Sequence, residues 1–350
     1  MQMTKYAGRL ATALAAATML TAGAATAEEE KVLNIYNWSD YIAEDTISNF
    51  EARTGIKVNY DVFDSNEVLE AKLLSGNTGY DIVVPSASFM ERQIKAGVFQ
   101  KLDKSALTNW GNLDPEIMER VALHDPGNAY SLPLMWGTTG IGYNEAKVAA
   151  VLPDAPVDSY AMLFDPEVVS KLASCGVTLL DSPTEVFSAA LVYLGKDPNS
   201  EDLDDLKAAE AVLAGIRPHI RYIHSSQQIN DLANGEICVA MGWSGDIMIA
   251  ADRAAEAENG IEISYSIPAE GTIIWFDMLA IPNDAPHPGN AHLFIDYLLE
   301  PEVIAAVSNY VYYANPNSAS VEFVEAEILE DPGIYPTPEV KAKLFPDLAH

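Results

Sequence analysis

Three short stretches of this 350-residue sequence combine a carboxylate with a large aromatic side chain. They run from Trp38 to Tyr41, from Trp243 to Asp246 and from Trp275 to Asp277. An aromatic ring attracts a cation through the negative face of its π system, and a nearby carboxylate adds Coulomb attraction and accepts charged hydrogen bonds. These stretches therefore favour a site for a cationic ligand.

Two of the acids also have a purely structural explanation that the sequence leaves open. Ser39 or Asp40 could cap a helix expected over residues 41–50, and Asp246 could cap the helix that follows it, since Ser and Asp are favoured N-cap residues. Asp277 differs because it lies inside the apolar stretch 272–282, which is expected to be a strand. A carboxylate buried in a strand needs a partner, which favours a functional role for Asp277.

Small hydroxyl residues stand at other places where a strand is expected to end. Ser86 and Ser88 follow a short apolar strand, although a serine at such a place is often only a helix cap. Ser182, Pro183 and Glu185 have the spacing of a capping box, which predicts a helix start and accounts for Glu185 without a ligand.

The sequence lacks the motifs of the main enzyme classes. It contains no His-Glu-x-x-His, no Walker loop, no Gly-x-Gly-x-x-Gly between a strand and a helix, and no cysteine pair with zinc-finger spacing. Ser244 resembles the serine of a nucleophile elbow, but Asp246 stands where that motif requires glycine. We therefore expect no catalysis, no cofactor and no metal.

Adjacent tyrosines at positions 312 and 313 suggest an alternative kind of binding site. Some ferric-ion-binding proteins use such a pair as ligands, whereas two aromatic residues at a helix end more often serve packing. A hard metal ion would also need a carboxylate or histidine ligand, and the sequence does not place one. A ferric-ion receptor that uses Tyr312 and Tyr313 is therefore the alternative function.

The elements that must position these side chains alternate along the chain. Strands are expected from Val32 and at 56–63, 80–84, 175–180, 237–241, 261–267 and 272–282, and helices at 65–75, 184–194, 203–214, 291–299 and 302–310. This alternation predicts an α/β fold with mainly parallel sheets. Ligands of such folds bind beyond the carboxyl ends of the strands, where the candidate residues are expected.

The chain is expected to form two lobes that it crosses between twice. The glycine-rich extended segment 131–144 leads into a second α/β pattern, and the last part of the chain suits a return. We expect lobe 1 to contain residues 28–133 and 257–350, and lobe 2 to contain residues 134–256. Two connections between lobes make a hinge beside a cleft, whose closure can bury a small ligand.

The net charge bears on the partners of the protein, and the first 27 residues bear on its location. The chain carries 20 Lys and Arg against 51 Asp and Glu, a formal net charge of −31, which disfavours nucleic acid and anionic membranes as partners. Residues 1–27 have the pattern of a secretory signal peptide, with Lys5 and Arg9 before an apolar run that ends in Ala25-Thr26-Ala27. We therefore expect an exported protein that is cleaved after Ala27.

The chain has two cysteines, Cys175 and Cys238, and both are expected on strands of lobe 2. In an oxidising compartment they can form one disulfide, worth about 4 kcal/mol in the chain-entropy model. Two buried free thiols are the alternative.

Several motifs taken together resemble the periplasmic putrescine/spermidine-binding proteins of bacterial ABC importers. These motifs are Tyr36-Asn37-Trp38-Ser39-Asp40-Tyr41, Tyr80-Asp81-Ile82-Val83-Val84-Pro85-Ser86, Gly242-Trp243-Ser244-Gly245-Asp246, Phe276-Asp277 and Tyr313-Ala314-Asn315-Pro316-Asn317. The similarity extends from about Leu33 to Phe345. It implies a two-lobed type II periplasmic-binding fold, no catalysis, a periplasmic location and a disulfide between the two cysteines.

The same resemblance implies a role for each candidate side chain. The aliphatic chain of the ligand would lie in an aromatic box formed by Trp38, Tyr41, Trp243, Trp275 and Tyr313. Hydroxyl or backbone groups would come from Ser39, Ser86 and Ser226, and the ammonium ends would face Asp40, Glu185, Asp246 and Asp277. Two buried ammonium groups need carboxylates at a matched separation, so the spacing of the acids should set specificity.

Details of the motifs favour putrescine over spermidine. Asp40 and Ser88 match the putrescine-binding members of the family, whereas Trp275 matches the spermidine-binding members. We therefore expect a monomeric polyamine receptor that takes putrescine first and spermidine second. It would deliver the polyamine to the permease subunits of an ABC importer in the inner membrane.

Overall fold

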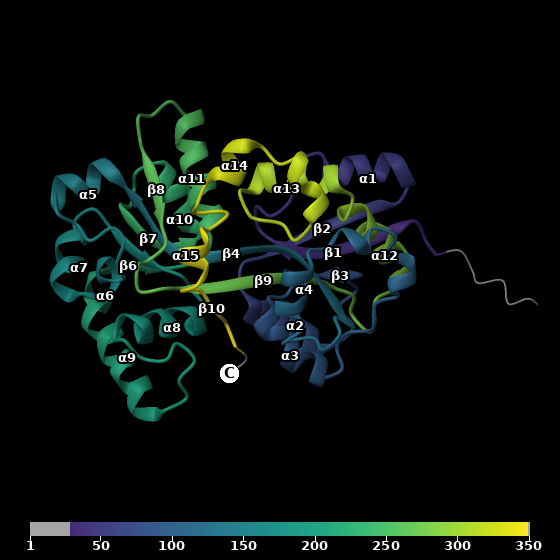
Figure 1. Ribbon diagram of the computed structural model, residues 1–350, viewed down its shortest axis with the longest axis horizontal. Coiled ribbons are helices and arrows are strands. Elements are labelled where there is room, and N and C mark those ends of the chain that lie inside the picture. The colour runs from purple at the N-terminus through teal and green to yellow at the C-terminus, as the bar shows by residue number, and fades with distance from the viewer. Residues whose placement is uncertain (1–28, 349–350) are drawn as a thin grey trace, which may run out of the picture.

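Two α/β lobes joined by two long strands make up the protein (Figure 1). The structure is a computed structural model that describes residues 29–348, so the expected signal peptide lies outside the described residues. In Figure 1 strands β4 (Ser131–Asn144) and β9 (Ile273–Ala280) run between the lobes. The two-lobed α/β fold expected from the sequence is confirmed. No helix among residues 29–348 is long and apolar enough to cross a membrane.

Lobe 1 is built around three parallel strands, and the apolar residues of the two inner ones are buried, whereas the outer one is partly exposed. Ile35 of β1 (Val32–Trp38) lies opposite Tyr60 of β2 (Lys57–Phe63) and Ile82 of β3 (Ile82–Val83). The helices of this lobe are α1 (Thr46–Thr54), α2 (Asn66–Ser75), α3 (Ala87–Lys95), α4 (Pro115–Val121), α12 (Pro288–Leu298) and α13 (Pro301–Val311). The last part of the chain adds α14 (Ala326–Glu330), α15 (Pro338–Lys341) and β10 (Phe345–Pro346).

Lobe 2 repeats this plan with β5 (Val177–Leu179) paired in parallel with β6 (Ile220–Ile223) and β7 (Val239–Trp243). Strand β8 (Ile263–Ser266) pairs with β4 in the antiparallel sense. The helices of lobe 2 are α5 (Glu145–Val151), α6 (Ala161–Phe164), α7 (Pro166–Leu172), α8 (Pro183–Tyr193), α9 (Leu203–Ile216), α10 (Gln227–Ala233) and α11 (Ser244–Glu256).

Strand β4 belongs to both lobes. The strand order is β2-β1-β3-β9-β4-β7-β5-β6, with β10 beside β9 and β8 beside β4. The first part of β4 pairs with β9 and the last part pairs with β7 and β8. Met135 and Trp136 accordingly lie in the core of lobe 1, whereas Ile141 lies in a core of lobe 2. The lobe boundaries expected at residues 134 and 256 stay predictions.

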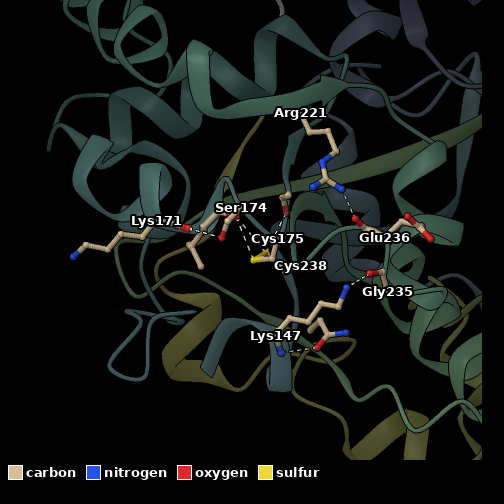
Figure 2. Close-up of a disulfide and its surroundings, with 11 residues drawn as sticks. Lys147, Lys171, Ser174, Cys175, Arg221, Gly235, Glu236 and Cys238 are labelled. Carbon is tan, nitrogen blue, oxygen red and sulfur yellow. Dashed lines mark hydrogen bonds between the residues drawn. A yellow bond between two sulfur atoms is a disulfide. The ribbon is translucent and has the colours of Figure 1, made fainter. Parts of the chain in front are cut away.

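A disulfide joins Cys175 and Cys238 inside lobe 2, as Figure 2 shows. The expectation that both cysteines lie on strands is wrong, because Cys175 precedes β5 and Cys238 directly precedes β7. Their Cα atoms are 5.4 Å apart, since the backbone N–H of Cys238 donates to the carbonyl of Gly176, at 3.0 Å. Gly176 has φ +105°, and a Cβ there would meet the Arg221 guanidinium at 2.6 Å.

Two helix starts differ from the sequence-based expectation. Helix α1 begins at Thr46, so neither Ser39 nor Asp40 caps it. Helix α8 has Pro183 in its first turn as expected, but Ser182 makes no side-chain cap. The Ser182 hydroxyl instead donates to the Glu185 carboxylate, at 3.1 Å. The capping box predicted from the spacing of these residues is therefore wrong.

Candidate ligand-binding site

A cavity between the two lobes brings most of the predicted site residues together. It encloses about 650 Å³, part of it open to solvent, a size usual for small-molecule sites. Every predicted residue except Asp40 and Ser88 lines it, namely Trp38, Ser39, Tyr41, Ser86, Glu185, Ser226, Trp243, Asp246, Trp275, Asp277 and Tyr313. They come from both lobes: Trp38 and Trp243 end strands, Glu185 and Asp246 lie in the first turns of helices, and Trp275 and Asp277 lie inside strand β9.

Asp277 is the buried acid of strand β9. Its Oδ2 accepts a hydrogen bond from the Tyr41 hydroxyl at 2.8 Å, and its Oδ1 accepts one from the Ser86 hydroxyl at 2.6 Å. Ser86 occupies the position before α3, yet its side chain makes no helix cap. Burial raises the pKa of Asp277 to about 7, because an apolar environment disfavours the charged form and outweighs these two hydrogen bonds.

Asp246 lies in the first turn of α11, after Ser244 and Gly245, and so is not the N-cap residue. The Tyr313 hydroxyl donates to Asp246 Oδ1 at 2.7 Å and accepts from the Asp246 backbone N–H at 3.0 Å. This approach requires glycine at position 245, since a Cβ there would lie 2.5 Å from the Tyr313 ring. Burial raises the pKa of Asp246 to about 7 despite the hydrogen bond from Tyr313.

Glu185 is the third buried acid and comes from α8 of lobe 2. Its carboxylate accepts hydrogen bonds from the hydroxyls of Thr139 and Ser182 and from Trp243 Nε1, which lies 3.1 Å from Oε1. Burial raises the pKa of Glu185 to about 7, and the Asp347 carboxylate contributes to the rise. All hydrogen bonds that hold Glu185 come from neutral donors.

Aromatic rings from both lobes meet across the cavity. Trp38 of lobe 1 and Trp243 of lobe 2 pack edge to face, with ring centroids 5.6 Å apart. Tyr313 packs in the same way on Tyr41, at 5.2 Å, and on Trp275, at 5.3 Å. The carboxylates of Asp246 and Asp277 are thus linked through two tyrosines that pack edge to face, and the lobes touch through their aromatic side chains.

Asp40 and Ser88 lie outside this cavity. Asp40 adopts a left-handed backbone conformation, with φ 53°, and forms an ion pair with Arg253 Nη2 of α11, at 2.7 Å. This ion pair connects the two lobes near the cleft. Ser88 is buried in α3, and its hydroxyl lines a smaller cavity next to the main one.

Some polar residues of the cavity wall were missed by sequence reasoning, among them Asp64, Asn66, Ser225 and Asp347. Phe63 ends strand β2 and Asp64 follows it, which repeats the aromatic-and-acid pattern, so a search of every strand end would have found them. Asp347 follows Phe345 and the short strand β10, and it was missed because no strand was expected in this C-terminal segment.

The side chains of the adjacent tyrosines Tyr312 and Tyr313 lie in different places. Tyr313 lines the cavity, whereas Tyr312 ends α13 in a left-handed conformation and hydrogen-bonds Asp252. Across residues 29–348 no group of three or more His, Cys, Asp or Glu could hold a metal ion. The two tyrosines therefore do not converge as a ferric-ion site requires.

Comparison with known proteins decides the family. Residues 45–337 match the family model described as bacterial extracellular solute-binding protein. The chain belongs to this family. The cavity of this solute-binding protein lies between its two lobes.

Relatives of this solute-binding protein match it along most of their length. The putrescine-binding periplasmic protein PotF of Escherichia coli is 58% identical over 334 residues, which cover 95% of this chain and 90% of that protein. The spermidine/putrescine-binding periplasmic protein of Escherichia coli is 36% identical over 326 residues, covering 93% and 89%. The solved structure of the spermidine/putrescine ABC transporter substrate-binding protein PotD from Streptococcus pneumoniae has a TM-score of 0.72 and 30% identity, covering 92% and 93%.

Proposed function

We propose that this solute-binding protein captures a polyamine in the interlobe cavity, putrescine first and spermidine second. One observation carries the proposal. Three carboxylates are buried in the cavity wall, and none of the described residues that line it is Lys, Arg or His. Because a buried carboxylate needs a positive partner, the ligand has to supply the cations.

The aromatic residues of the cavity support an aliphatic cation in particular. Trp38 and Trp243 offer apolar faces from opposite lobes, which suit a chain of methylene groups and attract an ammonium group. The acids stand on separate elements, Asp277 on β9, Asp246 on α11 and Glu185 on α8. A ligand with two ammonium groups joined by a short aliphatic chain satisfies this arrangement, and the 58% identical relative is named as putrescine-binding.

The proposal includes the biological setting. The protein would work as a monomer in the periplasm, after removal of residues 1–27, and would hand the polyamine to the permease of an ABC importer. It would act as a binding protein and not as an enzyme. The names of the relatives, which are periplasmic binding proteins and ABC transporter components, support this setting.

Isothermal titration calorimetry of the purified protein with putrescine, cadaverine, spermidine and spermine tests the proposal. We expect saturable binding with a stoichiometry of one, tightest for putrescine and next for spermidine. Ferric ion serves as the competing ligand, since a tyrosinate complex would be coloured. Absence of heat with all four amines would sink the polyamine function, and a coloured ferric complex would favour the alternative.

A further inference from the structure

Thr139 lies where strand β4 changes its partners between the lobes. On one side, β4 pairs with β9 as far as Thr138 and with β8 from Ile141 onward. On the other side, Thr139 pairs with Trp243 of β7. In the described part of the chain, Thr139 therefore has no strand partner on the first side. It is completely buried, so its polar groups need other partners there.

Two buried hydroxyls supply what the sheet lacks at this point. The hydroxyl of Thr272, directly before β9, donates to the Thr139 carbonyl. Because the Thr272 hydroxyl uses its only proton there, the Tyr160 hydroxyl donates to Thr272 Oγ1, at 2.7 Å. Both Tyr160 and Thr272 are fully buried. We call Tyr160, Thr272 and Thr139 the hydroxyl chain.

The side chain of Thr139 connects this hydroxyl chain to Glu185. Its hydroxyl donates to Glu185 Oε2. Trp243, the strand partner of Thr139, donates to the same carboxylate and lies 3.1 Å from Oε1. A hydrogen bond to a carboxylate is roughly twice as strong as one between neutral groups, and it favours the ionised form. Strand β4 thus favours the form of Glu185 that an ammonium group needs.

The other titratable groups near Glu185 do not help its ionisation. The Asp347 carboxylate raises the pKa of Glu185. Burial raises the pKa values of Tyr160 and Tyr265, so both hydroxyls stay neutral. Burial of Glu185 itself has the largest effect, and among its hydrogen-bond donors the Thr139 hydroxyl opposes this effect most.

We propose that Thr139 is a positioning residue that favours the ionised form of Glu185 and so prepares it for an ammonium group of the ligand. Thr139 does not line the cavity and therefore acts through Glu185. It does so from a strand that connects the lobes, where the hydroxyl chain fixes its backbone. The inference rests on the proposed polyamine function and adds the residue that extends ligand binding to lower pH.

The test is the Thr139→Val variant, titrated calorimetrically with putrescine at pH 6 and pH 8.5. Valine keeps the shape of the side chain and removes only the hydroxyl. We expect affinity to fall about tenfold at pH 6, which corresponds to a rise of about one unit in the pKa of Glu185. At pH 8.5, where Glu185 is largely ionised with or without ligand, affinity should change less than about threefold. Thr139→Ser keeps the hydroxyl and should restore the wild-type affinity.

Thr178→Val is the matched control for a buried threonine. Thr178 lies in β5 of lobe 2 and is completely buried, but its hydroxyl has no hydrogen-bond partner among the described residues. It also lies outside the wall of the cavity. Its replacement should leave putrescine affinity unchanged at both pH values.

A double variant shows whether Thr139 acts through Glu185. An amide at position 185 cannot ionise, so adding Thr139→Val to Glu185→Gln should change the pH dependence of putrescine affinity no further. An effect of Thr139→Val that persists in the Glu185→Gln protein would contradict the inference.

The remaining outcomes separate this inference from the function on which it rests. If Thr139→Val weakens putrescine equally at both pH values, or at neither, Thr139 does not favour ionisation of Glu185 and the inference is wrong. If Thr139→Val does not fold, as a thermal melt would reveal, Thr139→Ala compared with Thr139→Ser decides by the same two titrations. Failure of the wild-type protein to bind putrescine would overturn the proposed function itself.

Discussion

Three acids define the binding site at the level of single residues. Asp246, Asp277 and Glu185 are buried, their hydrogen-bond donors are neutral, and burial raises the pKa of each to about 7. An ionised carboxylate in such a place is unfavourable until a cation arrives. The affinity of the protein for a diammonium ligand therefore comes largely from groups that destabilise the unliganded cavity.

Asp277→Asn should weaken putrescine strongly. The amide keeps the shape of the side chain and can still bond the hydroxyls of Tyr41 and Ser86, but it leaves the ammonium group without its charged partner. Losing one member of a buried charge pair costs about 2–4 kcal/mol, roughly a 30- to 700-fold loss of affinity. Calorimetric titration measures this loss.

The unfolding temperature provides the control for that variant. Replacing an acid that burial disfavours should leave the stability of the unliganded protein at pH 7.5 unchanged or raise it. Asp204→Asn, on the exposed face of α9, is the neutral comparison. A destabilised Asp277→Asn protein would mean that Asp277 serves the fold and not the ligand.

Binding should release protons below neutral pH. Raised carboxyl pKa values mean that the free protein holds protons on these acids at pH 6, whereas the ligand requires their ionised forms. Affinity should therefore rise from pH 5 to about pH 8 and then level off. Titrations at pH 6 in two buffers of different ionisation enthalpy measure the protons directly, and proton uptake or no proton transfer would contradict the assignment.

The stability of the unliganded protein should follow the opposite trend. Because each folded-state pKa is raised above the ordinary carboxyl value of about 4, these acids favour the folded state least when ionised. The stability that these three acids contribute to the folded state is therefore lost as the pH rises from about 4 through about 7. Bound polyamine should reverse the trend in thermal melts.

Individual site residues could be predicted from the sequence where a side chain does not suit the helix or strand expected around it. Asp277 stood out because an acid inside an apolar strand needs a partner. Glu185 did not stand out, because the spacing of Ser182, Pro183 and Glu185 fits a capping box. The structure does not form this capping box. Asp40 shows the reverse case, because it matches the family motif and yet faces Arg253 outside the cavity.

Helix and strand ends position the site at the level of elements. Trp38 ends β1, Trp243 ends β7, and Asp246 lies in the first turn of α11. The helix N-terminus favours the ionised form of Asp246, although burial outweighs it. The sequence predicted most strands and helices within a few residues, because their apolar periods are clear. It misplaced the start of α1 by five residues, since residues 41–45 contain no strong helix breaker.

Gly245→Ala should disturb the start of α11 and with it the ligand site. The new Cβ would lie 2.5 Å from the ring of Tyr313, which lines the ligand cavity and would have to shift. Overpacking of this kind costs about 1–3 kcal/mol of stability, and because the shift displaces Tyr313 and Asp246 from the cavity wall, we expect putrescine affinity to fall as well. Calorimetry against the wild type measures it.

Gly215→Ala is the matched control for that substitution. Gly215 is also a helical glycine, in α9, and a Cβ there meets only Pro166 at an ordinary 3.8 Å. Its replacement should leave affinity unchanged and raise stability by up to about 1 kcal/mol through helix propensity. Equal effects of the two substitutions on affinity would show that contact with Tyr313 is not the cause.

Closure of the two lobes is the relevant property of the whole molecule. Contacts cross between the lobes inside the cavity, at Trp38 with Trp243 and at Tyr313 with Asp246, and outside it, at the ion pair of Asp40 with Arg253. That the chain forms two lobes was predictable from the two runs of alternating elements. The contribution of the C-terminal segment was not, because its partners lie far away in the sequence.

Asp40→Asn should make the ligand leave faster. The ion pair with Arg253 is partly exposed, and such pairs contribute about 0.2–1 kcal/mol, so the dissociation rate should rise roughly 1.5- to 5-fold with little change in association. Stopped-flow tryptophan fluorescence follows this rate, since Trp38 and Trp243 line the cavity. A slower association rate with unchanged dissociation would place Asp40 in ligand capture and not in closure.

A crystal structure of the protein with putrescine tests the central claim most directly. The account predicts an extended diamine in the interlobe cavity, against the rings of Trp38 and Trp243, with its nitrogen atoms within hydrogen-bond distance of the buried carboxylates, Asp277 among them. Putrescine bound elsewhere, or bound in the cavity with no nitrogen near a carboxylate, would contradict the account.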